Sequence, residues 1–372
     1  MIYDFLVIGG GMAGASAAYE LSAQGSVLLL EAEDVTGYHA TGRSAALFTR
    51  NYGPDTVRAI NAASVAFFVS PPLGFCDTPL LSARGCLTVA SSDTAGALDA
   101  VLALSTADAE IVEITPQEAC AMVPFLQSSH VARAVFEAGV TDIDVATLHL
   151  SYLKGAKARG AIVQTRQRVT ALARKAGCWQ VTTSQDSFQA KIVINAAGAW
   201  ADVVGALAGA RPVGMVPKRR TAIIIDGPDG LDCARIPAVD FAGSDAYMKP
   251  EAGKLMASPG DATPVEPHDA WANEMDIAVL ADWIMQRTTL EITGITHSWA
   301  GLRSFVVDGV PVVGFDATVP DFFWLAGQGG YGIMMAPVLA MLTADLCSNA
   351  ATPLTAQFAQ ALSPQRLRPS LE

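Results

Sequence analysis

The chain has 372 residues, enough for two or three domains of ordinary size or for one large intertwined unit. Hydrophobic residues make up 51% of the chain and charged residues 16%, which excludes a disordered protein and indicates a large core. The 24 basic and 36 acidic side chains give a formal net charge of −12 at pH 7. Such a surface repels phosphate groups, so we expect no nucleic-acid partner.

The six cysteines are widely spaced, and no pair of them has a zinc-ligand or redox-motif spacing. A chain of this length does not need disulfide bonds, so we expect reduced thiols, no metal site and a cytoplasmic protein. The first apolar stretch contains Asp4 and lacks a basic start, and the apolar stretch 331–347 contains Pro337 and Asp345. These features predict neither a signal peptide nor a transmembrane segment.

The first residues predict a strand, a glycine-rich turn and a helix. The apolar run 5–8 is typical of a buried parallel strand. It is followed by Gly9, Gly11 and Gly14, which have the spacing of a dinucleotide-binding loop. In such a loop the first glycine permits the tight turn, the second lets the backbone approach a pyrophosphate, and the third lets helix and strand pack closely.

The alanine-rich stretch 13–23 favours a helix, and 26–30 predicts a second strand that ends at Glu31. A carboxylate at this position accepts hydrogen bonds from a ribose diol and repels a 2′-phosphate. The start of the helix offers backbone N–H groups to phosphates. The motif by itself does not distinguish FAD from NAD.

Three later segments also suit a dinucleotide. The loop 41–44 combines hydroxyl groups, backbone N–H groups and a guanidinium, which suits a pyrophosphate. The apolar run 192–195 predicts a buried strand, and 196–198 has small residues that let a cofactor approach the backbone. The run 322–327 predicts a further strand, which 328–330 ends before an apolar helix.

Five sequence blocks resemble the D-amino-acid oxidase superfamily of FAD-dependent oxidoreductases and, within it, the bacterial D-arginine dehydrogenases. The blocks occur in the same order and span nearly the whole chain. They are 37–46, 195–200, 217–220, 296–304 and 328–333.

The resemblance implies one FAD per chain. No cysteine lies near 327–332, so we expect non-covalent binding rather than the covalent attachment of some relatives. The helix after 330 would stabilise negative charge on the reduced flavin. The cofactor-binding positions that the resemblance implies are Gly9, Gly11, Met12, Ala13, Gly14, Glu31, Ala32, Thr41, Gly42, Arg43, Ser44, Ala45, Ala46, Val169, Ala197, Gly198, Trp200, Arg303, Gly329, Gly330, Tyr331, Gly332 and Ile333.

Because the cofactor segments are dispersed, the FAD-binding domain is expected to be discontinuous. We expect a mixed α/β fold, with a Rossmann-like FAD-binding domain and a second, mixed-sheet substrate-binding domain. The predicted FAD-binding domain comprises 1–80, 140–210 and 300–372, and the predicted substrate-binding domain comprises 81–139 and 211–299. Within the latter, 84–90 and 221–225 are expected as strands and 247–256 as a hairpin.

The expected chemistry is hydride transfer from a substrate carbon to the flavin, for which the protein must bind and orient the substrate. Arginine is the natural partner of a substrate carboxylate. Arg303 and Arg220 match the carboxylate-binding positions of the family, and Tyr52 and Tyr247 match its substrate-contacting tyrosines. No Ser–His–Asp set or metal cluster is apparent in the sequence, and His39 is the histidine placed to line the cofactor loop.

The substrate pocket departs from that of the D-arginine dehydrogenases. The expected lining is Leu47, Cys86, Asp240, Gly330 and Met334. Cys86 stands where those relatives have the acid that grips a guanidinium, while Leu47 and Met334 replace polar residues. We therefore expect a preference for D-amino acids with neutral, apolar side chains. Asp240 replaces an apolar residue and either lies in a solvated loop or faces the cavity and supplies the missing acid.

Three functions remain open at this point. The first is an FAD-dependent D-amino-acid dehydrogenase or oxidase, which forms an imino acid that hydrolyses to a 2-oxo acid and ammonia. The second is oxidation of secondary amino acids or glycine (sarcosine, glycine, proline), or of 2-hydroxy acids. The third is a flavin-bound module without turnover, against which the two arginines argue. The electron acceptor, whether quinone, dye or oxygen, is not evident from the sequence.

Overall fold

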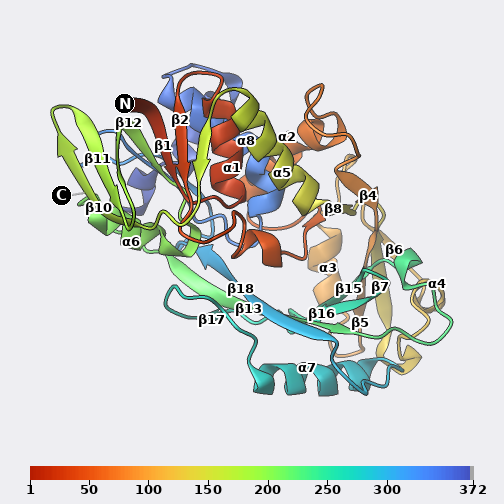
Figure 1. The fold of residues 1–372 in the computed structure, drawn as a ribbon. Helices are drawn as coiled ribbons and strands as arrows, with labels where there is room; N and C mark the ends of the chain where they lie inside the picture. Colours follow the sequence, from red (N-terminus) through yellow and green to blue (C-terminus); the bar gives the residue numbers. More distant parts are fainter. Residues whose placement is uncertain (369–372) are drawn as a thin grey trace.

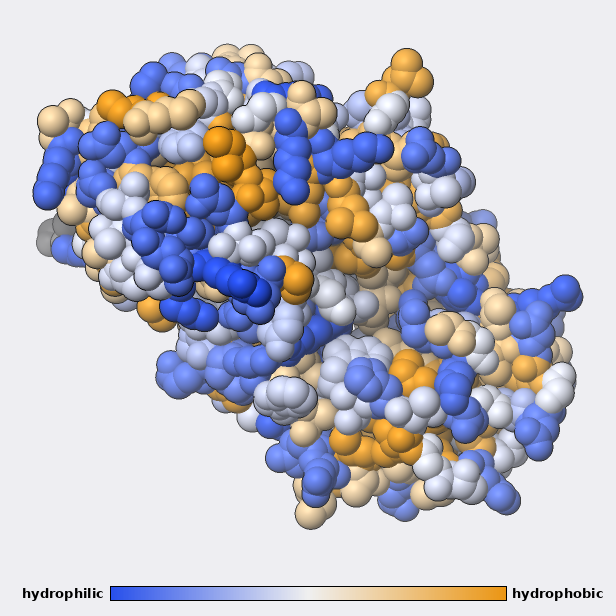
Figure 2. Space-filling view, viewed as in Figure 1, coloured by the Kyte–Doolittle hydropathy of each residue, from blue (hydrophilic) through white to orange (hydrophobic). Residues whose placement is uncertain are grey.

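The computed structural model describes residues 1–368 and shows two lobes, each built around its own β-sheet (Figure 1). The two lobes meet in the space-filling view, in which hydrophilic side chains cover much of the visible surface (Figure 2). The helices are α1 (Met12–Leu21), α2 (Asp55–Val69), α3 (Ala97–Leu102), α4 (Pro116–Met122), α5 (Val145–Ala158), α6 (Ala201–Leu207), α7 (Glu274–Arg287), α8 (Gly332–Cys347) and α9 (Pro353–Leu362).

The first lobe contains an eight-stranded sheet with a parallel centre. β1 (Ile2–Ile8) lies between β2 (Val27–Leu30) and β12 (Ser187–Asn195) and runs parallel to both. The other strands of this sheet are β9 (Ile162–Gln164), β10 (Val169–Lys175), β11 (Cys178–Thr183), β19 (Val312–Phe315) and β20 (Phe322–Ala326). The strands and the helix that the sequence predicts around the glycine motif are confirmed.

Both faces of this sheet are covered, which explains why its central strands carry runs of apolar residues, as in residues 5–8 and 27–30. Along β1, Phe5 and Val7 pack in a core that includes side chains of α1, α2, α5 and α8. Leu6 and Ile8 point to the opposite face, where they pack in a second core with Trp324 and residues of α6. The alternation of side chains along a strand assigns successive residues to these two cores.

The second lobe contains a nine-stranded mixed sheet. Its strands are β5 (Cys86–Ala90), β6 (Val112–Ile114), β7 (Arg133–Glu137), β13 (Val216–Ile225), β14 (Ala238–Phe241), β15 (Tyr247–Glu251), β16 (Lys254–Ser258), β17 (Thr263–Pro264) and β18 (His297–Phe305). The long antiparallel pair β13 and β18 reaches from this sheet toward the first lobe (Figure 1). A separate small sheet consists of β3 (Leu47–Phe48), β8 (Thr141–Ile143) and β4 (Leu81–Ala83).

The mixed α/β fold and the predicted hairpin at β15 and β16 are confirmed. The predicted return of the chain to the first domain is placed at residue 300, which lies inside β18. The pairing of β18 with β13 continues past residue 300, as far as the pair of Phe305 with Val216. Residues 300–305 therefore belong to the second sheet. The sequence of β18 contains no proline, and its one glycine, Gly301, does not interrupt the strand.

No helix within residues 1–368 combines the length and the apolar character that are needed to cross a membrane. Over the same residues, no three His, Cys, Asp or Glu side chains are grouped so that they could bind a metal ion.

Candidate active site

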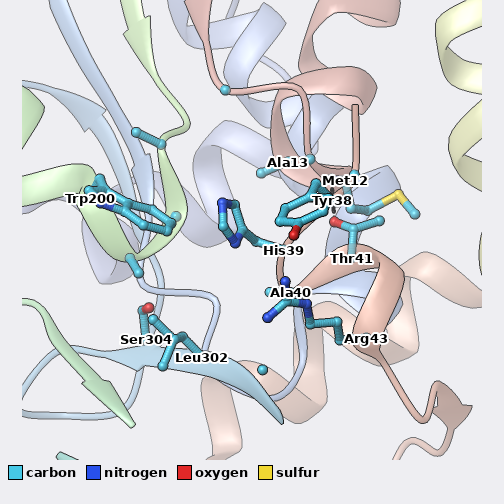
Figure 3. Close-up of a pocket in the computed structure, with 18 of the residues that line it drawn as sticks. Met12, Ala13, Tyr38, His39, Ala40, Thr41, Arg43, Trp200, Leu302 and Ser304 are labelled. Carbon is cyan, nitrogen blue, oxygen red and sulfur yellow. Dashed lines mark hydrogen bonds between the residues drawn. The ribbon is translucent and has the colours of Figure 1, made fainter. Parts of the chain in front are cut away.

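A cavity of about 360 Å³ is formed by segments that are far apart in the sequence. It is lined by the start of α1, by the loop 37–45 and by the loop 328–330 of the first lobe, and by residues of β13, β15, β16 and β18 of the second. Figure 3 shows Met12 and Ala13 across the cavity from Trp200, with Leu302 and Ser304 of β18 on a further wall.

The glycine-rich turn leaves no room for side chains. A Cβ atom on Gly9, which has φ +108°, would lie 2.4 Å from the carbonyl oxygen of Ala196. A Cβ atom on Gly14 would lie 1.9 Å from the carbonyl oxygen of Gly9, so α1 packs directly on the end of β1. The backbone N–H of Met12 donates to Thr41 Oγ1 at 2.9 Å, which attaches the loop 41–44 to the start of α1. The turn therefore places a helix N-terminus at the cavity wall, a suitable position for a phosphate.

Glu31 lies at the end of β2 and lines the same cavity. Its carboxylate accepts hydrogen bonds from the N–H groups of Gly10 at 2.7 Å and of Glu33 at 2.9 Å. Behind the turn, the buried side chain of His149 donates from Nε2 to the carbonyl oxygen of Gly10 at 2.8 Å. Burial lowers the pKa of His149, although the Gly10 carbonyl and Glu31 oppose the shift. Residues 9–11 are thus held from both sides.

Aromatic and charged side chains gather on one side of the cavity. The ring of His39 packs on Trp200 with a centroid separation of 4.7 Å and on Tyr38 at 4.9 Å (Figure 3). The sequence predicts that the guanidinium of Arg43 faces a pyrophosphate, but the structure directs it elsewhere. It donates to the carbonyl oxygen of Ala270 at 2.9 Å and also to the carboxylate of Asp269. Arg43 therefore joins the cofactor loop to the segment that precedes α7.

Two arginines lie at the other end of the cavity. On neighbouring strands β13 and β18, Arg220 is paired with Gly301, and Arg303 lies two residues further along on the same side. Arg303 Nη2 donates to the hydroxyl of Tyr247 in a long hydrogen bond of 3.5 Å, and Tyr52 lies near Arg303. A Cβ atom on Gly330 would lie 3.1 Å from Arg303 Nη1, so this glycine gives the guanidinium its space against the loop 328–330.

The electrostatics of this end favour an anion. Burial lowers the pKa of Arg220, and the like charge of Arg303 lowers it further. Burial also acts to lower the pKa of Arg303, but the nearby Tyr247 and Tyr52 outweigh it and raise that pKa. A carboxylate between the two guanidinium groups relieves their mutual repulsion and supplies the acceptors that both can share.

Most of the sequence-predicted site residues meet in the cavity. Those that line it are Gly9, Gly11, Met12, Ala13, Glu31, Ala32, Thr41, Arg43, Ser44, Ala45, Val169, Ala197, Gly198, Trp200, Arg220, Tyr247, Arg303, Gly329, Gly330, Gly332 and Ile333. Gly14 and Gly42 lie just outside the lining. Gly14 lies at the contact of α1 with β1, and the N–H of Gly42 donates to the carbonyl oxygen of Gly37 at 2.8 Å. The remaining predicted residues lie outside this lining.

These outer residues have three different environments. Leu47 belongs to the small sheet, where it pairs with Asp142, and the carbonyl oxygen of Ala46 just before it accepts from the N–H of Ile143. Met334 and Tyr331 are buried in the first-lobe core, and the ring of Tyr331 contacts that of Tyr52 at 5.0 Å. Met334 is thus removed from the expected substrate wall by its place in α8, which turns it toward the core.

The last two, Cys86 and Asp240, lie together on the second sheet. Cys86 Sγ donates to Asp240 Oδ2 at 3.4 Å, and the exposed carboxyl group of Asp240 lies outside the cavity lining. Glu137, on the strand next to Cys86, was not predicted. Lining residues that the sequence did not indicate include Glu33, Gln167, Arg168, Ala222, Met256, His268 and Ala270. Most are brought in by tertiary contacts and carry no local sequence signal.

The residues present fit an FAD. Gly9 and Gly11 leave a cradle at the start of α1 that a Cβ atom would fill, since a Cβ on Gly11 would lie 3.2 Å from Thr41 Oγ1. Met12 and Ala13 would hold the pyrophosphate, and the carboxylate of Glu31 would face the ribose. The loop 328–330 would face the ring. This donor set suits the FAD of a flavin-dependent oxidoreductase.

The chain belongs to the FAD dependent oxidoreductase family, which it matches over residues 4–346. It is 22% identical to glycine oxidase of Geobacillus kaustophilus over 384 residues, which cover 94% of each chain. It is 24% identical to human mitochondrial dimethylglycine dehydrogenase over 90% of this chain but only 41% of that protein. The chain thus spans less than half of this larger relative.

Solved structures have the same fold. L-proline dehydrogenase from P. horikoshii superposes with a TM-score of 0.84 at 22% identity, covering 98% of this chain and 97% of the other. L-alpha-glycerophosphate oxidase from Mycoplasma pneumoniae, solved with FAD bound, superposes with a TM-score of 0.84 at 19% identity, covering 95% and 97%. The predictions of the family and of FAD as the cofactor are confirmed.

Proposed function

We propose that the chain is an amino-acid oxidoreductase that oxidises the carbon–nitrogen bond next to a substrate carboxylate. The observation that carries this proposal is the pair Arg220 and Arg303, which project from the second lobe into the FAD cavity beside the hydroxyl of Tyr247. Two guanidinium groups near one another in a desolvated site need an anion, and a carboxylate matches their planar donors.

FAD supplies the hydride acceptor of the reaction. The task of the chain is to present the substrate carbon to it. Arg303, with Arg220, would bind the carboxylate, and Tyr247 and Tyr52 would fix the guanidinium of Arg303 and close the cavity around the substrate. Such orientation removes much of the entropic barrier to the reaction, and the exclusion of water strengthens each polar contact. The imino acid that forms is then hydrolysed to a 2-oxo acid with release of ammonia or an amine.

The identity of the amine is the finer question. D-amino acids are one candidate class, because the carboxylate site resembles that of the D-amino-acid enzymes. Glycine and secondary amino acids such as sarcosine and proline are the second class. The similarity to glycine oxidase and to dimethylglycine dehydrogenase favours this second class, as does the fold of L-proline dehydrogenase. All of them carry the carboxylate that the two arginines require.

Anaerobic bleaching of the flavin tests the proposal without any assumption about the electron acceptor. The purified holoprotein is mixed with glycine, sarcosine, D- and L-proline, a set of D- and L-amino acids, and lactate as a hydroxy acid. Loss of the yellow absorbance with at least one amine substrate is expected. Bleaching by lactate alone, or by none of these compounds, would overturn the assignment.

A further inference from the structure

Both ring nitrogens of His39 face carboxylate oxygens. Nε2 lies 3.2 Å from Glu33 Oε1, which is a hydrogen-bond distance, and Nδ1 lies 3.9 Å from Asp269 Oδ1. Glu33 follows β2 in the first lobe, whereas Asp269 precedes α7 in the segment that follows β17. A neutral imidazole has one N–H group and one lone pair, so only the protonated ring presents a hydrogen to both carboxylates.

The ring of His39 lies in the cofactor cavity. It is part of the cavity lining, as is Glu33, and it lies between Trp200 and Ala13 in the close-up (Figure 3). The side chain of His39 is 25% exposed, and the rings of Trp200 and Tyr38 pack against it at 4.7 and 4.9 Å. Solvent therefore screens a charge on this ring only in part, and the charge acts on whatever fills this end of the cavity.

Two carboxylates and two guanidinium groups form the cluster around His39, so their charges cancel. Glu33 Oε1 also accepts a hydrogen bond from Arg168 Nη2 at 3.2 Å, and the carboxylate of Asp269 accepts one from Arg43. Burial acts to raise the pKa of Asp269, but the hydrogen bonds to its carboxylate outweigh burial and lower that pKa. Asp269 therefore stays ionised at neutral pH, as do the guanidinium groups.

Three further titratable side chains adjoin this cluster. The hydrogen bond to Asp269 raises the pKa of Tyr38, so the hydroxyl of Tyr38 stays neutral. The carboxylate of Glu31, which also lines the cavity, accepts from two backbone N–H groups. His268 is a lining residue too, and its Nδ1 lies 2.7 Å from the carbonyl oxygen of Glu266 in the same loop. Because histidine is the residue type that titrates near neutral pH, His268 is the natural control for His39.

FAD brings the negative charge of its pyrophosphate into this cavity. Met12 and Ala13 would hold the pyrophosphate at the start of α1, and the helix N-terminus compensates part of its charge. The cluster around His39 offers no surplus positive charge while the ring is neutral, because Arg43 and Arg168 are each bound to a carboxylate. One proton on the imidazole supplies that surplus.

We propose that FAD binding is coupled to the uptake of one proton by His39, whose imidazolium form compensates the pyrophosphate and holds Glu33 and Asp269 together. The proton comes from solvent, and no bond other than the new N–H is formed. The affinity for FAD then falls as the pH rises, because a neutral ring must gain its proton before it contributes. This inference concerns the cofactor alone and does not depend on which substrate the enzyme oxidises.

The test measures the FAD dissociation constant of the full-length holoprotein between pH 6.5 and 8.5. In this range His149 stays neutral, since burial lowers its pKa below the ordinary value of 6.5. Samples are diluted at constant ionic strength, and the recovery of flavin fluorescence is followed to equilibrium. His39→Asn removes the titrating ring, and His268→Asn is the matched control from the same cavity lining. FAD absorbance before dilution reports whether each variant is folded.

The wild type should bind FAD at least about fivefold more weakly at pH 8.5 than at pH 6.5, as expected for one coupled proton. In His39→Asn the dissociation constant should change less than twofold over this range, whereas His268→Asn should keep the dependence of the wild type. The slope with pH identifies the proton, because loss of the ring packing on Trp200 weakens binding equally at every pH.

Three results would overturn the inference. The first is a wild type whose affinity for FAD is independent of pH or increases as the pH rises. The second is a His39→Asn variant that keeps the wild-type slope, and the third is a His268→Asn variant that loses it. If His39→Asn does not retain FAD on purification, His39→Gln replaces it, since glutamine cannot titrate either. Flavin bleaching by amino acids is a separate measurement, so the proposed function stands or falls independently of these results.

Discussion

The carboxylate of Asp269 accepts a hydrogen bond from the guanidinium of Arg43, 226 positions away in the sequence. The same carboxylate accepts from the hydroxyl of Tyr38 at 3.0 Å and lies 3.9 Å from Nδ1 of His39. Asp269 belongs to the segment between β17 and α7, whereas the other three belong to the cofactor loop. This cluster fastens one lobe to the other along the edge of the FAD cavity.

Removal of this link should weaken the retention of FAD. Because Asp269 is partly exposed, we expect a modest effect of about 1 kcal/mol, which is roughly a fivefold increase in the FAD dissociation constant of Asp269→Asn. The recovery of flavin fluorescence on dilution measures it. Tyr38→Phe removes one of the contacts and should have a smaller effect. Unchanged FAD affinity in Asp269→Asn would show that the link is a surface contact without a role in cofactor retention.

Arg303 should dominate substrate binding. Arg303→Ala leaves the substrate carboxylate without its main partner, and loss of such a pair costs a few kcal/mol, so the catalytic efficiency should fall at least about a hundredfold. Arg303→Lys retains the charge but not the planar pair of donors and should be intermediate. FAD content, read from the absorbance of the purified protein, should stay normal in both. Near-normal kinetics in Arg303→Ala would refute the assignment.

Gly14 should tolerate no side chain. In Gly14→Ala, the new Cβ would lie 1.9 Å from the carbonyl oxygen of Gly9, so α1 must move away from β1. Overpacking of this kind costs roughly 1–3 kcal/mol and displaces the phosphate-facing turn. We expect a lower melting temperature and a protein purified with little FAD. The matched control is Gly96→Ala, where a Cβ meets nothing within 4 Å; a similar loss in the control would remove the explanation.

His149 should make stability fall on mild acidification. Burial lowers its pKa in the folded protein below the ordinary value of 6.5, so the unfolded chain binds a proton first as the pH falls. The contribution of neutral His149 is therefore complete above about pH 6.5 and decreases below it. His149→Gln retains a donor for Gly10 and cannot titrate. Urea unfolding at pH 8, 6.5 and 5.5 should show the advantage of the wild type shrinking with acid; a constant difference would contradict the prediction.

Short sequence patterns predict the glycine-rich turn and the strand and helix on either side of it. The spacing of Gly9, Gly11 and Gly14 between two apolar runs is sufficient to place a helix N-terminus at the end of a parallel strand, because each glycine answers a separate steric demand. Arg303 was found for a different reason: its block resembles that of known relatives. Neither inference required knowledge of distant contacts.

Such patterns do not predict the direction in which a long side chain points. Arg43 lies in the expected loop, but its guanidinium turns to Asp269 and Ala270, which no local signal relates to it. Glu137 lies opposite Cys86 because β7 pairs with β5, and Met334 is buried in the core because of the orientation of α8. Sheet register and helix rotation are set by the whole core, so these residues could not be placed from the sequence.

The order of strands in the first lobe has a consequence for biosynthesis. β1 and β2 are made well before β12 and β20, which complete the centre of the sheet at residues 187–195 and 322–326. At typical translation rates, β20 leaves the ribosome roughly 15–60 s after β1. During that interval the apolar strands β1 and β2 have no finished sheet to join and are exposed to aggregation and to chaperones. The cofactor turn is therefore synthesised long before the strands that complete its sheet.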